Sequence, residues 1–179
     1  MSSTAEDRAY TKAIANVPLR SVTGVFYRAV PKPVADYALE DGPSYTYQNR
    51  YNVAQQFGAL YFGDRAEVCK STLEKRGLLS SRRIPHVLLS FDIHVDHIVD
   101  LTLADARKLL GLERGELVAP RTAPQAYETT HAIAMAAYHS GHICGLLTPD
   151  ATETGNSLVL YPARLLARDF IRLRDRVAL

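Results

Sequence analysis

Short runs of β-branched and aromatic residues recur along this chain, and they constrain its fold more than any other feature. Runs of this composition, bounded by Gly, Pro and polar residues, are typical of β-strands. Fewer segments carry the apolar spacing of a helix. Because strands outnumber helices and are interspersed with them, the sequence predicts an α+β fold, a single compact domain with a curved mixed or antiparallel sheet. The predicted strands are 22–27, 59–62, 85–93, 97–101, 143–147, 157–161 and 170–173, and the predicted helices are 65–76, 102–110 and 127–139.

The length of the chain suits one domain. It has 179 residues, of which 47% are hydrophobic and 22% charged, as in ordinary globular proteins. Residues 1–20 carry little pattern, and we expect an N-terminal arm or a short helix there. Residues 21–179 then form the domain. Segments 34–49 and 111–125 are predicted to be a long loop and a connector.

Several classes of protein are disfavoured by the bulk composition. The net charge is +2, from 21 basic and 19 acidic residues, which gives no basic footprint for direct nucleic-acid binding. No apolar run approaches the roughly 20 residues of a membrane span, and the N-terminus is polar. We therefore expect a cytoplasmic protein with no membrane contact. Cys69 and Cys144 are expected to be reduced and buried.

One stretch, residues 50–74, carries the chemistry. It sets Arg50, Tyr61 and Glu74 around a short strand, a turn and a helix, and Arg28 follows an upstream strand. Arginine binds phosphate, tyrosine offers a stacking surface, and a fixed carboxylate stabilises the positive sugar formed when an N-glycosidic bond breaks. These are the parts needed to bind and cleave a nucleotide. The alternative interpretations are surface ion pairs for the arginines, a core aromatic for Tyr61 and a solvated acid for Glu74.

The helix that carries Glu74 can be described more closely. Asp64 is a plausible N-cap, and Ala66, Cys69 and Leu73 fall on one face at helical spacing. Glu74 lies one position beyond Leu73, near the edge of that face. We therefore expect its carboxylate to be partly buried, as suits a catalytic acid.

Roughly residues 22–162 carry a series of short motifs in a fixed order. They are Tyr27-Arg28 at the end of a strand, Arg50-Tyr51-Asn52, Gly58, Ala59-Leu60-Tyr61, Glu74, Val99-Asp100-Leu101, Thr129-Thr130 in an alanine-rich helix, Gly145-Leu146-Leu147, Pro149-Asp150-Ala151, and Asn156 before the strand 158–161. In this order the motifs resemble a known family, the RES domain, which is the toxin half of a common bacterial toxin–antitoxin pair.

This resemblance implies a fold like that of ADP-ribosylating toxins, with NAD bound as substrate in a cleft. It implies an antitoxin partner with an Xre-type helix-turn-helix. It also implies that the catalytic residues are Glu74, Arg28 and Tyr61, and that NAD is bound by Arg28, Arg50, Tyr27, Tyr61, Asp150 and Asn156.

The chain departs from the family at one position. The family has Ser in its Pro-Ser-Ala turn, whereas this chain has Asp150. An aspartate there could accept a hydrogen bond from a ribose hydroxyl, but it would add negative charge near a pyrophosphate.

Three functions stay open at this point. The first is a toxin that cleaves NAD by hydrolysis or phosphorolysis. The second is an ADP-ribosyltransferase that modifies a protein acceptor, such as phosphoribosyl pyrophosphate synthetase, with the Tyr-rich segment 34–49 as the acceptor surface. The third is a degenerate binding module without catalysis. The pairs His94/His97 and His139/His142 lack a further ligand pattern, so no metal is expected.

Overall fold

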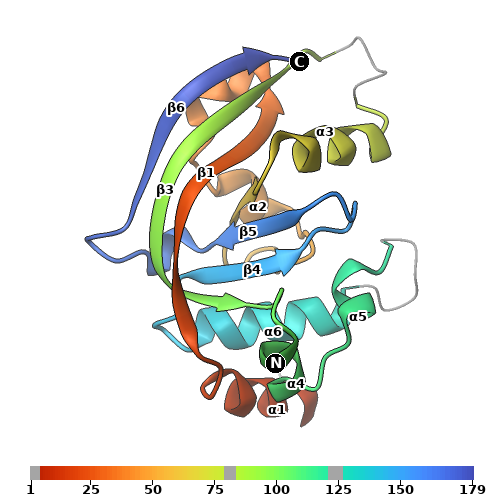
Figure 1. Ribbon diagram of the computed structural model, residues 1–179, viewed down its shortest axis with the longest axis vertical. Coiled ribbons are helices and arrows are strands. Elements are labelled where there is room, and N and C mark those ends of the chain that lie inside the picture. The colour runs from red at the N-terminus through yellow and green to blue at the C-terminus, as the bar shows by residue number, and fades with distance from the viewer. Residues whose placement is uncertain (1–4, 79–83, 121–126) are drawn as a thin grey trace.

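The computed structural model describes residues 5–78, 84–120 and 127–179, which form an α+β domain (Figure 1). The α-helices are α1 (Ala5–Ile14), α2 (Gly42–Thr46), α3 (Ala66–Lys75), α4 (Ala104–Leu109), α5 (Arg114–Val118) and α6 (Glu128–His139). The 3-10 helices are η1 (Lys32–Tyr37) and η2 (Pro162–Arg164). The strands are β1 (Leu19–Pro31), β2 (Leu60–Gly63), β3 (His86–Asp100), β4 (Gly145–Pro149), β5 (Asn156–Leu160) and β6 (Phe170–Ala178).

The strands form one six-stranded sheet in the order β1-β2-β5-β4-β3-β6, with an additional pairing between β1 and β3. The long strands β1 and β3 run antiparallel, and β6 flanks β3 on its other side. The short strands β4 and β5 cross these long strands at a steep angle (Figure 1). Among the strand pairs of the described residues, β3–β4 is parallel and the others are antiparallel. The predicted α+β class and curved mixed sheet are therefore confirmed.

Three local predictions from the sequence are wrong. The two strands expected at 85–93 and 97–101 are one strand, β3, in which His97 adopts a positive φ of 57° and bends the chain without ending it. The expected loop 34–49 contains the short helices η1 and α2, and the expected connector contains α5. These helices are of five or six residues, too short for apolar periodicity to reveal them.

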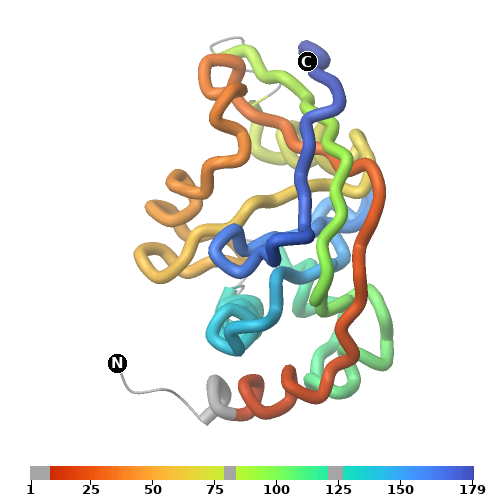
Figure 2. Tube along the Cα trace, turned by 90° about the vertical axis from the view of Figure 1, so that its left-hand side faces the viewer, coloured from red at the N-terminus to blue at the C-terminus, as the bar shows by residue number. Residues whose placement is uncertain are grey.

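The N-terminal segment folds as the short helix α1 and packs against α6. Ile14 and Val17 at its end are 1% and 4% exposed, so they are part of the core. Figure 2 shows α1 and the C-terminal end of β6 at opposite ends of the molecule.

The apolar core has two parts, one on each side of the short strands. The first gathers α1, α4, α5 and α6 against β4 and β5, and includes Tyr51 and Phe57. The second lies between the long strands β1 and β3 and the short strands β2 and β5, and includes Phe26 and Phe62. The segment 49–62 therefore runs between both cores, and it carries most of the candidate site.

Candidate functional site

Arg28 is a desolvated cation without a partner of opposite charge. Strand alternation places it on the same side of β1 as Phe26 and Val30, facing the second core. Its Nη1 donates to the carbonyl of Tyr61 at 3.1 Å, and its guanidinium lies 5.8 Å from the centre of the Phe62 ring. Its Nε–H is buried without a hydrogen-bond partner. Burial lowers the pKa of Arg28, and no carboxylate among the described residues pairs with it.

Arg50 is half-buried and, like Arg28, has one guanidinium nitrogen without a partner. Its Nη2 donates to the carbonyl of Ala119 at 2.6 Å, and its guanidinium lies 5.2 Å from the centre of the Tyr127 ring. Its Nη1 is buried without a partner, and within the described part of the chain no carboxylate forms an ion pair with it. Since buried cations are normally paired, the two arginines together have the chemistry of an anion-binding site.

Tyr61 connects the two arginines. Its carbonyl accepts the hydrogen bond from Arg28. Its hydroxyl accepts from the backbone N–H of Tyr51 at 3.0 Å and donates to Oδ1 of Asn52 at 2.9 Å. Burial of this hydroxyl raises the pKa of Tyr61, so it stays protonated at neutral pH. One end of Tyr61 therefore holds Arg28, and the other end holds the turn that carries Arg50.

Several polar residues of this network were not proposed as site residues from the sequence. Asn52 is fully buried and donates to the carbonyl of Tyr47 at 3.0 Å. The hydroxyl of Tyr51 lies 2.7 Å from that of Thr148, and burial raises the pKa of Tyr51 to about 12. His131 bonds through Nε2 to the carbonyl of Asn49 at 2.7 Å. The sequence signal for Tyr51 and Asn52 was their direct succession to Arg50, and for His131 its place one helical turn after Tyr127.

Glu74 lies on the predicted helix but is more exposed than expected. It lies on α3, whose buried residues Cys69 and Leu73 face the sheet, but its own side chain is exposed. The expectation of a partly buried carboxylate is therefore wrong. Glu74 follows Leu73 by one residue, and the 100° rotation per residue turns it off the inner face. Among the described residues, no hydrogen bond or ion pair links it to the arginines.

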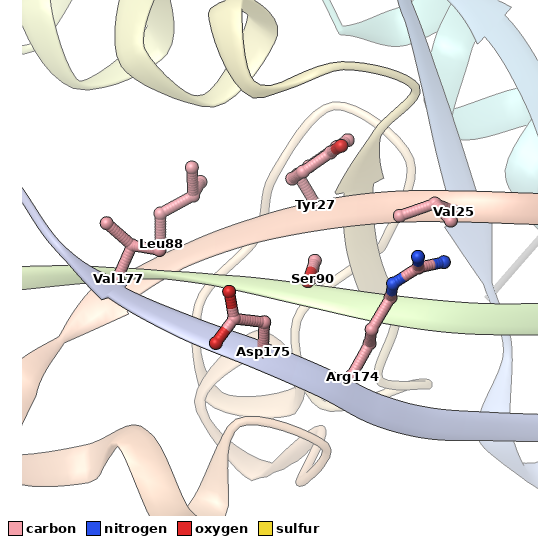
Figure 3. A pocket seen from close by; sticks show the side chains of 7 residues that line it. All are labelled: Val25, Tyr27, Leu88, Ser90, Arg174, Asp175 and Val177. Carbon is pink, nitrogen blue, oxygen red and sulfur yellow. The ribbon is translucent and has the colours of Figure 1, made fainter.

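Tyr27 and Arg28 are adjacent in sequence but separated by the structure. Successive side chains of a strand point to opposite faces. Arg28 faces the second core, whereas Tyr27 lines an open cavity of about 320 Å³ across β1, β3 and β6 (Figure 3). Tyr27 and Arg28 thus lie on opposite faces of β1, and the assignment of both to one NAD site stays a prediction. The cavity is lined by Val25, Tyr27, Leu88, Ser90, Arg174, Asp175 and Val177.

Asp150 and Asn156 organise the loop between β4 and β5. The Asp150 carboxylate accepts hydrogen bonds from the backbone N–H and the hydroxyl of Thr152 and from the hydroxyl of Ser157, at 2.6, 2.5 and 2.7 Å. Asn156 donates through Nδ2 to Oδ2 of Asp64 at 2.8 Å. The predicted N-cap role of Asp64 is wrong, since Arg65 holds that position and has no side-chain cap bond. Asp64 instead ties the start of α3 to β5.

We expect Asp150→Ser to destabilise the protein. Serine cannot reproduce three accepted hydrogen bonds, and a hydrogen bond to a charged group contributes roughly 1.5–3 kcal/mol net. A net loss of about 1–2 kcal/mol in the free energy of unfolding is expected from urea titration. Asp150→Asn, which keeps the shape and one acceptor oxygen, should lose less. Equal stability of wild type and Asp150→Ser would contradict this role.

The profile of the RES domain family matches residues 25–175. The chain belongs to the RES domain family. A chain of the crystal structure of the M. tuberculosis MbcT–MbcA toxin–antitoxin complex has the same fold, with a TM-score of 0.81 at 23% sequence identity over 98% of this chain and 94% of that chain. No curated protein matches this chain. The resemblance read from the ordered motifs is confirmed at the level of the family and of the fold.

Two other features bear on the site. No group of three or more potential metal ligands occurs among the described residues. Within the same residues, no helix is long and apolar enough to cross a membrane.

Proposed function

We propose that this RES domain protein is a toxin that binds NAD and cleaves its nicotinamide–ribose bond. The observation that supports this most is that Arg28 and Arg50 each have one buried guanidinium nitrogen without a hydrogen-bond partner, and that Tyr61 bonds both to Arg28 and to the turn after Arg50. NAD carries two linked phosphates, and a guanidinium with a free N–H is suited to each of them. Binding the pyrophosphate would remove the cost of leaving these cations unpaired.

The proposed reaction needs little acid–base help. The bond between ribose C1′ and the nicotinamide nitrogen breaks, and its electron pair leaves with the already cationic ring. Phosphate, or water that releases a proton to the solvent, then forms the new bond to C1′. A carboxylate beside the ribose would stabilise the developing positive charge. Glu74 is our candidate, since the family resemblance assigns it that role, and its exposed side chain leaves the carboxylate available to a bound ligand.

The decisive test is release of nicotinamide from NAD by the purified protein, with and without phosphate, followed by chromatography. Release without phosphate indicates hydrolysis, and release that requires phosphate indicates phosphorolysis. If no nicotinamide appears under either condition and calorimetry detects no NAD binding, the proposed function is wrong and a non-catalytic binding module becomes the better account.

We expect Glu74→Gln to lower kcat for nicotinamide release by about 100-fold or more with little change in KM, because the charge acts on the transition state. Glu67→Gln is the matched control, since Glu67 is also an exposed glutamate of α3. Equal loss in both variants, or loss in neither, would remove Glu74 from the catalytic role.

A second candidate function is transfer of ADP-ribose to a protein. It is favoured by a cluster of exposed aromatic side chains on and around α2: Tyr37, Tyr45 and Tyr47 are 62%, 47% and 71% exposed. Exposed tyrosines are common in protein–protein contacts. Labelled NAD added to a cell extract separates the two functions, because one labelled protein band indicates transfer and free ADP-ribose alone indicates cleavage.

The proposed partner is an Xre-type antitoxin, and the proposed compartment is the cytoplasm. The shared fold with a chain of a toxin–antitoxin complex supports a partner of this kind. Expression of the chain alone should arrest growth, and co-expression with a helix-turn-helix protein encoded beside it should restore growth and yield a co-purifying complex. Growth unaffected by an active, soluble chain would contradict the toxin assignment.

A further inference from the structure

The turn that carries Arg50 is held by more than its own backbone. Asn49 and Asn52 form an isolated β-bridge, and Nδ2 of Asn49 donates to Oδ1 of Asn52 at 3.1 Å. The Tyr61 hydroxyl bonds both to the backbone N–H of Tyr51 and to the same Oδ1 of Asn52. A single hydroxyl thus fixes two successive residues immediately after Arg50.

The guanidinium of Arg50 is fixed from its other side by different elements. Ala119, directly after α5, supplies the accepting carbonyl, and Tyr127, at the start of α6, supplies the ring. These contacts occupy Nη2 and one face of the guanidinium, while Nη1 is left without a partner. The direction of that free N–H therefore depends on where the turn 49–52 places the base of the side chain.

We infer that Tyr61 is a positioning residue, whose hydroxyl sets the turn 49–52 so that the free N–H of Arg50 is preset for an anionic group of the ligand. This inference rests on the proposed function, because it names how that site binds its phosphates. Tyr61 contacts both parts of the site. Its backbone carbonyl orients Arg28, and its side-chain hydroxyl, through the turn 49–52, orients Arg50. A side chain that already has its binding orientation loses less conformational entropy on binding than a mobile one.

The substitution Tyr61→Phe separates this role from stacking. Phenylalanine keeps the ring, so a purely stacking residue would leave the kinetics of NAD cleavage unchanged. If the hydroxyl positions Arg50, KM should rise by about 10-fold while kcat changes by less than about twofold, because a phosphate contact is made equally in the ground state and the transition state. An unchanged KM would overturn the inference.

A double substitution tests whether Tyr61 acts through Arg50. With Arg50→Ala already present, adding Tyr61→Phe should change KM by less than about twofold, since the positioned group is gone. If the two substitutions instead raised KM by independent factors that multiply, Tyr61 would not act through Arg50. Tyr161→Phe is the matched control: it also removes the hydroxyl of a buried tyrosine, but among the described residues that hydroxyl has no hydrogen-bond partner, so KM should stay that of wild type.

An NMR measurement without NAD tests the role of Tyr61 independently of the proposed substrate. The Nε–H resonance of Arg50 in an NMR spectrum, assigned by its loss in Arg50→Lys, should be sharp in wild type and broadened in Tyr61→Phe, at unchanged thermal stability within a few degrees. If wild type neither binds nor cleaves NAD but this resonance still responds, the positioning role stands and the proposed substrate is wrong. If the resonance is the same in both proteins, the positioning role is wrong.

Discussion

Arg28→Met is expected to abolish NAD cleavage and at the same time to stabilise the ligand-free protein. If Arg28 donates to a phosphate of NAD, as proposed, its loss should lower kcat/KM by about 100-fold or more. Burial lowers the pKa of Arg28, and no described carboxylate compensates for its charge. Methionine fills a similar space beside Phe62 without a charge to desolvate, so the free energy of unfolding should rise by about 1 kcal/mol. Nicotinamide release and urea titration measure the two effects.

The same substitution elsewhere on β1 provides the control. Arg20 donates to the carboxylate of Asp100 at 2.5 Å, and Asp100 is only 2% exposed. Arg20→Met would leave a buried carboxylate without its ion pair and should lower stability by roughly 1–3 kcal/mol. Both variants replace an arginine of β1 with methionine, but Arg28→Met is expected to raise the free energy of unfolding and Arg20→Met to lower it. A destabilised Arg28→Met protein would show that its charge is compensated in the free state, and retained activity would remove Arg28 from the site.

Gly145→Ala is expected to lower the free energy of unfolding by about 3 kcal/mol or more. Gly145 begins β4 and lies between Leu160 of β5 and Ile98 of β3. A methyl group there would lie 2.2 Å from the carbonyl oxygen of Val159, which is backbone and cannot rotate away. The strands β4 and β5 would have to separate at the point where the two cores meet. Urea unfolding followed by circular dichroism measures the loss.

Gly115→Ala is the matched control for this effect. Gly115 lies in α5, and a methyl group there meets nothing within 4 Å. Alanine should therefore stabilise the protein by roughly 0.5–1 kcal/mol, through its better helix propensity. If Gly145→Ala is tolerated as well as Gly115→Ala, the close approach of β4 and β5 in the structure is wrong.

The sequence predicted the elements that carry a long local pattern. The strand before Arg28 and the strand containing Tyr61 were correctly expected from their β-branched and aromatic composition, and the helix 65–76 from its apolar spacing. The sequence did not predict η1, α2 and α5, because each is shorter than two turns. It also divided β3 into two strands at a bend, whereas β3 pairs with β1 on both sides of that bend. The nucleotide-binding and cleaving role of residues 50–74 was inferred from residue types alone, and it stays a prediction.

The arrangement of the site came from the tertiary structure. By itself, the sequence determined the α+β class, the family and the arginine, tyrosine and glutamate inventory, since these depend on composition, period and order along the chain. Only the packed structure decided that Tyr27 faces away from Arg28, that Glu74 is exposed, and that Asp150 is occupied by its own loop. It also decided that Tyr61 links the two unpaired arginines. The physical reason is that the direction of a side chain and its hydrogen-bond partners depend on residues that are distant in sequence.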